Sequence, residues 1–183
     1  GKIQLVFGKS GYGKSTLLNL ISGFKLENLI WKGEILIEKK NIMRQAPEIR
    51  QIGFLMQERF LFPHLSVFEN LYFAIPKYIN NKKQLIHDYI EENSLTNILE
   101  FYPYQLSGGQ STRIACIRTL LSFPKVILMD EPFSSLDEIT KTQFRKFVKT
   151  KLNFLNIPCI LVTHDSQDKK ISDNEVINLK KYI

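Results

Sequence analysis

The stretch GKSGYGKS, residues Gly8–Ser15, fits the pattern G-x-x-x-x-G-K-[ST], whose glycine-rich backbone curls around phosphate oxygens. It lies between Ile3–Phe7, an apolar run typical of a short buried strand, and Ser15–Ile21, which is helical in pattern. This order of strand, loop and helix is the context in which the pattern binds phosphate, because the positive end of the helix faces the same anion. We therefore expect a nucleotide here, with Lys14 spanning its β- and γ-phosphates and the Ser15 hydroxyl ligating Mg²⁺.

A second element, the apolar run Val126–Met129, is typical of a buried strand and ends in two carboxylates. Beside a phosphate loop, Asp130 can hold Mg²⁺ through a water molecule, and Glu131 can polarise the attacking water as a general base. Acids that only cap a strand end are the alternative interpretation, which the phosphate loop makes the weaker one. The expected ligands are a nucleoside triphosphate, identified below as ATP by resemblance, and Mg²⁺. The residues expected to bind this nucleotide are Gly8, Lys9, Ser10, Gly11, Tyr12, Gly13, Lys14, Ser15 and Thr16.

A second glycine-rich turn, LSGGQ at Leu106–Gln110, precedes a helical stretch that runs to about Leu121. Ser107 and Gln110 have the spacing of a capping box, so we expect a helix to begin there with open N–H groups and a positive dipole end. The phosphate loop already has its own helix terminus. This second terminus therefore indicates a second phosphate site, or the far side of one site shared between two subunits. Standing alone, the motif would indicate only a capped turn without a ligand.

Strand and helix patterns alternate along most of the chain, which favours a mainly parallel sheet with helices on its faces. Between Gln57 and Ser107 the pattern is helical with breaks at Pro76 and Asn80-Asn81, so we expect a separate lobe there. The further expected strands are Glu34–Glu38, Gln51–Met56, Pro158–Val162 and Val176–Leu179. The apolar face expected on a helix over residues 138–155 consists of Ile139, Phe144, Phe147, Val148, Leu152 and Leu155.

The composition, with 183 residues of which 44% are hydrophobic and 23% charged, is that of one ordinary globular domain. No apolar run approaches the ~20 residues needed to cross a bilayer. Cys116 and Cys159 lack metal-like spacing, so we interpret them as buried side chains in a reducing compartment, the cytoplasm. The formal charge of +7 comes from scattered pairs such as Lys39-Lys40, which are typical of a solvated surface. Attraction to an anionic membrane leaflet or a phosphate-rich ligand stays open as the alternative.

In order, and over essentially the whole chain, these motifs closely resemble those of the nucleotide-binding subunits of ATP-binding cassette (ABC) transporters. The matching segments are Gly8–Ser15 for the Walker A loop, Gln57 in FLMQE for the Q-loop, Leu106–Gln110 for the signature motif, Val126–Glu131 for the Walker B strand, Ser134–Asp137 for the D-loop and Thr163–Asp165 for the switch histidine. The resemblance implies an α/β fold of the P-loop NTPase (RecA-like) kind. Its core would comprise residues 1–57 and 107–183, with an ABC-type helical subdomain, 58–106, inserted between them.

The resemblance also implies a shared active site. Two such domains pack head to tail, so a homodimer or a paired nucleotide-binding domain is expected. Each ATP then lies between the Walker A loop of one subunit and the signature motif of the other. By this resemblance Asp137 carries information between the two sites. The residues implied to contact the partner's ATP are Ser107, Gly108, Gly109 and Gln110.

The catalytic residues that the resemblance assigns are Glu131, His164 and Gln57. His164 would hold the γ-phosphate and position the water and Glu131, while Gln57 would sense Mg²⁺ and link the site to the helical lobe. A histidine at a strand end that makes only a local hydrogen bond is the alternative interpretation of His164. The implied Mg²⁺ ligands are Ser15, Gln57 and Asp130, the last through water.

The segment LFPHLSVFENL, Leu61–Leu71, is similar to the segment after the Q-loop in ATPases of bacterial binding-protein-dependent importers, such as those for thiamine, sulfate, iron or polyamines. The implied function is ATP hydrolysis that powers a solute importer. The implied partners are transmembrane permease subunits and, indirectly, a solute-binding protein, with no nucleic acid. The chain is then expected in the cytoplasm, peripheral on the inner face of the plasma membrane.

Two departures from the family pattern keep alternatives open. Family members carry two strands and an adenine-stacking aromatic ahead of the position of Gly1, a segment expected to be absent here, so the chain is a fragment or adenine is held in another way. Thr112-Arg113 replaces the usual glutamine-arginine pair, which we interpret as tolerable drift. One alternative is a regulatory subunit that binds nucleotide without turnover. The other, a non-transport ABC ATPase, is disfavoured because those carry coiled-coil insertions or two cassettes.

Overall fold

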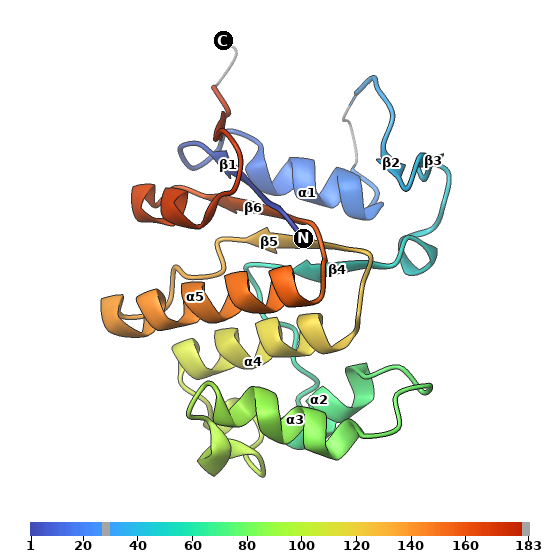
Figure 1. The fold of residues 1–183 in the computed structure, drawn as a ribbon. Coiled ribbons are helices and arrows are strands. Elements are labelled where there is room, and N and C mark those ends of the chain that lie inside the picture. The colour runs from blue at the N-terminus through green and yellow to red at the C-terminus, as the bar shows by residue number, and fades with distance from the viewer. Residues whose placement is uncertain (27–29, 181–183) are drawn as a thin grey trace.

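A parallel sheet forms the centre of the protein, whose computed structural model describes residues 1–26 and 30–180 (Figure 1). The strands of this sheet are β1 (Ile3–Phe7), β4 (Ile52–Leu55), β5 (Val126–Asp130), β6 (Cys159–Thr163) and β7 (Ile177–Asn178). They lie in the order β4-β5-β6-β1-β7, and each neighbouring pair is parallel. The predicted α/β class with a mainly parallel sheet is therefore confirmed.

Helices cover both faces of the sheet. The longer ones are α1 (Lys14–Ser22), α2 (Val67–Ala74), α3 (Lys82–Glu91), α4 (Gly108–Leu121) and α5 (Glu138–Phe154). Figure 1 shows α1 on one face and α4 and α5 on the other, with α2 and α3 beyond α4. Side chains alternate along β1, because Leu5 joins the core under α4 and α5 while Val6 packs with Leu18 of α1. The sheet is thus buried on both sides and fixes where its strand ends lie.

The helical region between β4 and α4 is broken where the sequence predicts. Helix α2 ends at Ala74, just before Pro76, and α3 begins after Asn81. The Ser66 hydroxyl accepts a hydrogen bond from the Glu69 N–H, and the Glu69 carboxylate accepts one from the Ser66 N–H, so a capping box starts α2. Two short 3₁₀ helices follow α3, η2 (Thr96–Ile98) and η3 (Pro103–Gln105).

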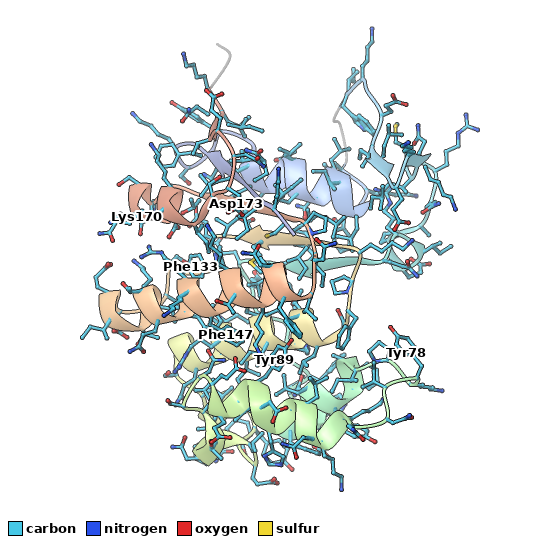
Figure 2. All side chains as sticks on the ribbon, in the orientation of Figure 1. Tyr78, Tyr89, Phe133, Phe147, Lys170 and Asp173 are labelled. Carbon is cyan, nitrogen blue, oxygen red and sulfur yellow. The ribbon has the colours of Figure 1, made fainter. Side chains whose placement is uncertain are left out.

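Helix α3 packs against α5, which joins the helical region to the layers of the sheet. Tyr89 and Phe147 meet edge to face with ring centroids 5.9 Å apart (Figure 2). The Lys151 ammonium lies 4.3 Å from the centre of the Tyr89 ring and also pairs with Glu92 at 2.7 Å. One hydrophobic core therefore continues from the sheet into this region. The exact limits of a 58–106 subdomain stay a prediction.

The strand predicted over Glu34–Glu38 is too long, because only Leu36–Ile37 forms a strand there. The chain forms instead a small antiparallel hairpin of β2 (Leu36–Ile37) and β3 (Lys40–Asn41), outside the main sheet. Glu38 and Lys39 have φ angles of 51° and 65°, so the chain reverses within these two residues. Such a turn is usually marked by asparagine or glycine, and neither is present to signal it.

Helix α5 buries a narrower face than predicted. Phe144, Val148 and Leu152 are buried at helical spacing, whereas Ile139 is 74% exposed, so its predicted place in the apolar face is wrong. Ile139 lies five positions before Phe144, roughly 140° around a helix of 3.6 residues per turn. The two predicted buried cysteines, Cys116 and Cys159, are confirmed.

A buried arginine fixes the end of α1 that is far from the phosphate loop. Arg50 follows a short 3₁₀ helix, η1 (Pro47–Ile49), and is 6% exposed. Its guanidinium donates to the carbonyl oxygens of Leu20 at 3.3 Å and Ile21 at 2.7 Å in the last turn of α1. A cation at this end of a helix is favourable because the carbonyl dipoles point toward it.

In the described residues, 1–26 and 30–180, no helix combines the length and the apolar character needed to cross a membrane.

Candidate phosphate-binding active site

The loop between β1 and α1 leaves a helix terminus open toward a pocket. Gly13, the residue before α1, has φ of 80°, and the helix start has no side-chain cap. A Cβ atom on Gly13 would meet nothing within 4 Å, so the backbone conformation rather than space demands glycine here. The first N–H groups of α1 are thus free for an anion.

Lys14 is held where a phosphate is expected. Its side chain is 5% exposed, and its ammonium donates to the carbonyl oxygens of Gly8 at 2.9 Å and Lys9 at 3.1 Å. The same ammonium lies 3.9 Å from Glu131 Oε1. A buried cation needs such partners, and these neutral carbonyl oxygens can be exchanged for negatively charged phosphate oxygens.

The carboxyl ends of the parallel strands bring the predicted residues together in one pocket of about 550 Å³. Gln57 follows β4, Asp130 ends β5, and His164 follows β6. Ligand sites of open α/β sheets commonly form at this edge. The pocket is lined by Phe7, Gly8, Lys9, Ser10, Gly11, Gly13, Lys14, Ser15, Thr16, Gln57, Asp130, Glu131 and His164. Tyr12, predicted with the loop, is not among them, and Phe7 is a lining residue that the sequence did not single out.

Asp130 and Ser15 offer neighbouring oxygen ligands. Burial raises the pKa of the Asp130 carboxyl, and a hydrogen bond with Ser15 opposes that rise. Among the described residues no three His, Cys, Asp or Glu side chains form a metal site by themselves. Two hard oxygen donors fit Mg²⁺ that is completed by water and nucleotide phosphates.

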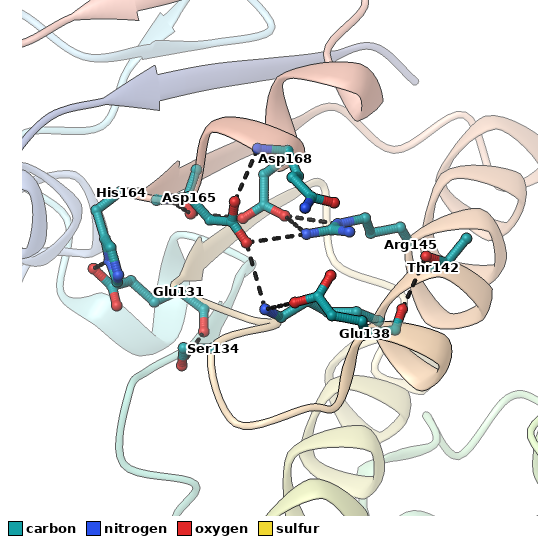
Figure 3. A network of polar contacts seen from close by, with 11 residues as sticks. Glu131, Ser134, Glu138, Thr142, Arg145, His164, Asp165 and Asp168 are labelled. Atoms are coloured by element: carbon teal, nitrogen blue, oxygen red, sulfur yellow. Dashed lines mark hydrogen bonds and ion pairs between the residues drawn. The ribbon is translucent and has the colours of Figure 1, made fainter.

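Glu131 is strained and directly contacts His164. One carboxylate oxygen of Glu131 lies 2.7 Å from His164 Nδ1, and the His164 side chain is 57% exposed (Figure 3). Glu131 has φ of 49°, which is unfavourable for a residue with a Cβ and costs on the order of 1–3 kcal/mol. Its N–H donates to the Val162 carbonyl at 3.0 Å, and Ser134 donates back to its carbonyl, so the local turn is fixed.

A network of ion pairs holds the residues on either side of His164 (Figure 3). The Thr163 hydroxyl donates to Asp168 at 2.6 Å, and Arg145 of α5 pairs with the same carboxylate at 2.6 Å. Asp165 pairs with Arg145 at 3.3 Å and with Lys141 at 3.4 Å. A backbone hydrogen bond from Gln167, assisted by the two cations, lowers the pKa of Asp165. The histidine therefore projects from an anchored backbone.

Sequence reasoning missed this network. Lys141 and Arg145 are four residues apart on α5, which signals only a polar helix face. Their partners come after the next strand. Asp165 is the residue just before the short 3₁₀ helix η4 (Ser166–Ile171), and Asp168 lies within that helix.

The signature and D-loop residues lie outside the pocket of their own chain. Ser107 Oγ accepts from the Gln110 N–H at 3.2 Å, and Gln110 Oε1 accepts from the Ser107 N–H at 2.9 Å, which confirms the predicted capping box of α4. A Cβ on Gly109 would lie 3.2 Å from Leu136 Cδ2 of the D-loop, whereas Gly108 faces open space. Asp137 caps α5 by accepting from the Thr140 N–H at 3.0 Å.

The parallel sheet, the open helix terminus and the carboxylates at the strand ends define a nucleotide-binding ATPase of the P-loop class. Residues 1–134 match the family described as ABC transporter. The chain is 37% identical over 184 residues to the uncharacterized ABC transporter ATP-binding protein YnjD of Escherichia coli strain K12, a match that covers 100% of this chain and 84% of the relative. This protein therefore belongs to the ABC transporter family, and it is an ATPase of that type.

Two import proteins are also similar over nearly the whole chain, which spans about half of their length. The sulfate/thiosulfate import ATP-binding protein CysA of Neisseria meningitidis serogroup A is 37% identical over 97% of this chain and 51% of its own. The spermidine/putrescine import ATP-binding protein PotA of Legionella pneumophila is 38% identical over 97% and 49%. Among solved structures, the cassette MJ0796 in a dimeric post-hydrolysis state with ADP and Pi superposes with a TM-score of 0.82 at 30% identity, covering 98% of this chain and 81% of that one.

Proposed function

We propose that this chain is the ATP-binding and ATP-hydrolysing subunit that powers an ABC importer. The observation that carries the catalytic part is the 2.7 Å contact of Glu131 with His164 in the wall of the phosphate pocket. A carboxylate steadied by an imidazole at this position can polarise a water for attack on the γ-phosphorus. Glu131 is the general base in this proposal, and His164 contacts the γ-phosphate and orients Glu131.

The phosphates and Mg²⁺ are bound in this proposal by residues of the loop and by residues at or just after the ends of β4 and β5. Lys14 exchanges its carbonyl partners for β- and γ-phosphate oxygens, which gives the cation a stronger ligand. Ser15, Gln57 and Asp130 hold Mg²⁺, the last through water, and all three line the pocket. The metal, when bound, neutralises phosphate charge.

Two copies of the chain complete the site in this proposal. The start of α4 and Asp137 do not line the phosphate pocket of their own chain, although Gly108 at that start faces open space. A head-to-tail pair brings Ser107, Gly108, Gly109 and Gln110 of one subunit to the nucleotide held by the other. The dimeric ADP-bound cassette that this chain resembles supports such a pairing.

Import is supported by the named relatives and by an exposed aromatic surface near the Q-loop. Phe60, Phe62 and Phe73 are all exposed, and Phe62 meets Phe73 edge to face at 5.2 Å. Large apolar side chains gathered on a surface mark interaction sites. We place a transmembrane permease there, which holds this subunit on the cytoplasmic face of the membrane, and a solute-binding protein acts through that permease.

The catalytic assignment is tested by Glu131→Gln in the full-length protein. The variant removes the base but leaves Lys14, Ser15 and Asp130 in place, so ATP should still bind while hydrolysis falls by ~10²–10⁴-fold. With hydrolysis blocked, size-exclusion chromatography with ATP and Mg²⁺ should show a dimer. Hydrolysis at the wild-type rate would remove Glu131 from its role.

The shared site is tested by adding Ser107→Arg to that variant. A long cation at this position crowds the partner's γ-phosphate, so the ATP-dependent dimer should disappear while one subunit still binds ATP. A dimer that persists argues against the shared site.

The importer assignment is tested by co-purification with the membrane partner, which should reveal a solute that stimulates ATP hydrolysis. Residues 62–67 should be protected from hydrogen exchange only in that complex. Equal exchange with and without the permease would refute this docking surface.

A further inference from the structure

One buried hydroxyl joins segments that carry residues of the proposed ATP site. Thr112 of α4 is 5% exposed. Its Oγ1 receives a hydrogen bond from Arg59 Nε at 2.6 Å, lies 2.7 Å from Ser135 Oγ, and donates to the Gly108 carbonyl at 3.0 Å. A hydroxyl has one hydrogen and two acceptor positions. If Thr112 donates to Gly108, then Arg59 and Ser135 both donate to it, and every bonding position is used.

The joined segments are three that the ATP site needs together. Arg59 lies two residues after Gln57, which lines the phosphate pocket. Gly108 belongs to the signature turn, and Ser135 lies two residues before Asp137. The hydroxyl thus ties the pocket of this subunit to the surface proposed to face its partner.

Arg59 is the inward anchor of an otherwise exposed stretch. Gln57, Glu58 and Phe60 are exposed, whereas Arg59 is only partly so. A second hydrogen bond joins this stretch to α4, from Arg118 Nη2 to the Phe60 carbonyl at 2.9 Å, and it does not involve the D-loop.

Other threonines of the chain show what an ordinary helical hydroxyl does. Thr119 and Thr142 each donate to the carbonyl four residues earlier, at 2.9 Å, as threonines in helices commonly do. Neither shows a further side-chain hydrogen bond in the described residues. Thr112 makes the same back bond and in addition accepts contacts from two other segments. The substitution that the sequence suggests to be drift therefore has partners of its own.

We propose that Thr112 is a positioning residue that sets Gln57 relative to the signature turn and the D-loop, an inference that rests on the proposed function. The hydroxyl does not line the phosphate pocket, so it acts through the segments that it joins. Losing it should leave ATP binding to one subunit unchanged and slow turnover.

The test compares Thr112→Val, which keeps the shape and removes the hydroxyl, with Thr112→Ser, which keeps it. In the nucleotide-free protein, Thr112→Val should raise amide hydrogen exchange in residues 57–61 and 134–137, and Thr112→Ser should not. The kcat for ATP should fall about tenfold, the size expected when a buried donor loses its partner, with little change in KM. Thr142→Val is the matched control, because it removes only a back bond.

A second variant guards against a folding defect. Arg59→Met removes the donor from a partly exposed position and should reproduce the loss in kcat. Combined with Thr112→Val it should add little, because both remove the same hydrogen bond. Additive losses in the double variant would contradict the junction.

The outcomes separate this inference from the proposed function. Unchanged exchange in both segments would overturn the inference whether or not the protein hydrolyses ATP. Raised exchange with unchanged kcat would reduce Thr112 to a structural anchor and also overturn it. A wild-type protein that binds but does not hydrolyse ATP would instead refute the proposed function, while the exchange data would still decide whether Thr112 joins the segments.

Discussion

Two helices of this protein begin after glycine-rich turns, yet they begin in different ways. Helix α1 has no side-chain cap, and a buried lysine and two carboxylates stand around its start. Helix α4 caps itself through Ser107 and Gln110, and its start lies outside the phosphate pocket. The first N–H groups of α1 have no side-chain cap, and they face a ligand pocket lined by residues of the same chain. The start of α4 is stable without a ligand, which suits a surface that meets its nucleotide only when a second subunit arrives.

The largest expected effect is at the start of α1. Lys14→Ala removes the buried cation from the phosphates and should weaken ATP binding by about 2–5 kcal/mol, which is at least thirtyfold. Titration of the full-length variant with a fluorescent ATP analogue measures this. Lys40→Ala on the exposed hairpin is the control and should bind normally. Unchanged affinity in Lys14→Ala would refute the assignment of residues 8–15 as the phosphate loop.

The next prediction compares alanine substitutions of one glycine from each of the two turns, Gly13 and Gly108. Gly13→Ala forces an alanine into φ of 80°, which costs about 1–2 kcal/mol and should lower both stability and ATP affinity. Gly108→Ala meets open space at the first residue of α4, so stability and ATP binding to one subunit should be unchanged. Its Cβ should disturb only the ATP-dependent dimer. Thermal unfolding and nucleotide titration are measured for both variants. Equal losses of stability and ATP affinity in the two variants would contradict the distinction between the two helix starts.

The smallest effect concerns the cap itself. Ser107→Ala should lower the free energy of unfolding by about 0.5–2 kcal/mol, because α4 loses its capping hydroxyl. ATP affinity of one subunit should stay the same. Ser66→Ala, which removes the equivalent cap from α2, should cost similar stability without affecting the dimer. Urea unfolding compares the two variants, and a dimer weakened equally by both would indicate general destabilisation rather than a role of the α4 start.

Local chemistry explains what the sequence predicted well. The loop Gly8–Ser15, the acids after β5 and the Ser107–Gln110 cap depend on residues close together in the chain, so spacing alone reveals them. The loop and the two acids converge because the strands are parallel and the carboxyl ends of such strands meet at one edge of the sheet, whereas the Ser107–Gln110 cap lies outside that pocket.

Features that depend on distant partners could not be predicted. Arg145 supports Thr163 through Asp168, across a helix, a loop and a strand, and no periodicity links these positions. Thr112 looked like drift because its partners Arg59 and Ser135 lie far away in the sequence. The Glu38-Lys39 turn was missed for another reason, since its residues tolerate positive φ without favouring it.

The backbone conformation of Glu131 lowers the stability of the fold at a residue that the proposed ATP hydrolysis requires. Its φ of 49° suits glycine or asparagine better than glutamate, so Glu131→Gly should relieve the backbone strain of the turn. A protein evolved only for heat resistance would then accept a change that silences it. Deep mutational scanning with separate selections for abundance and for ATP-dependent growth would expose this conflict as opposite scores at one position. Equal scores in the two selections would show that the turn carries no such cost.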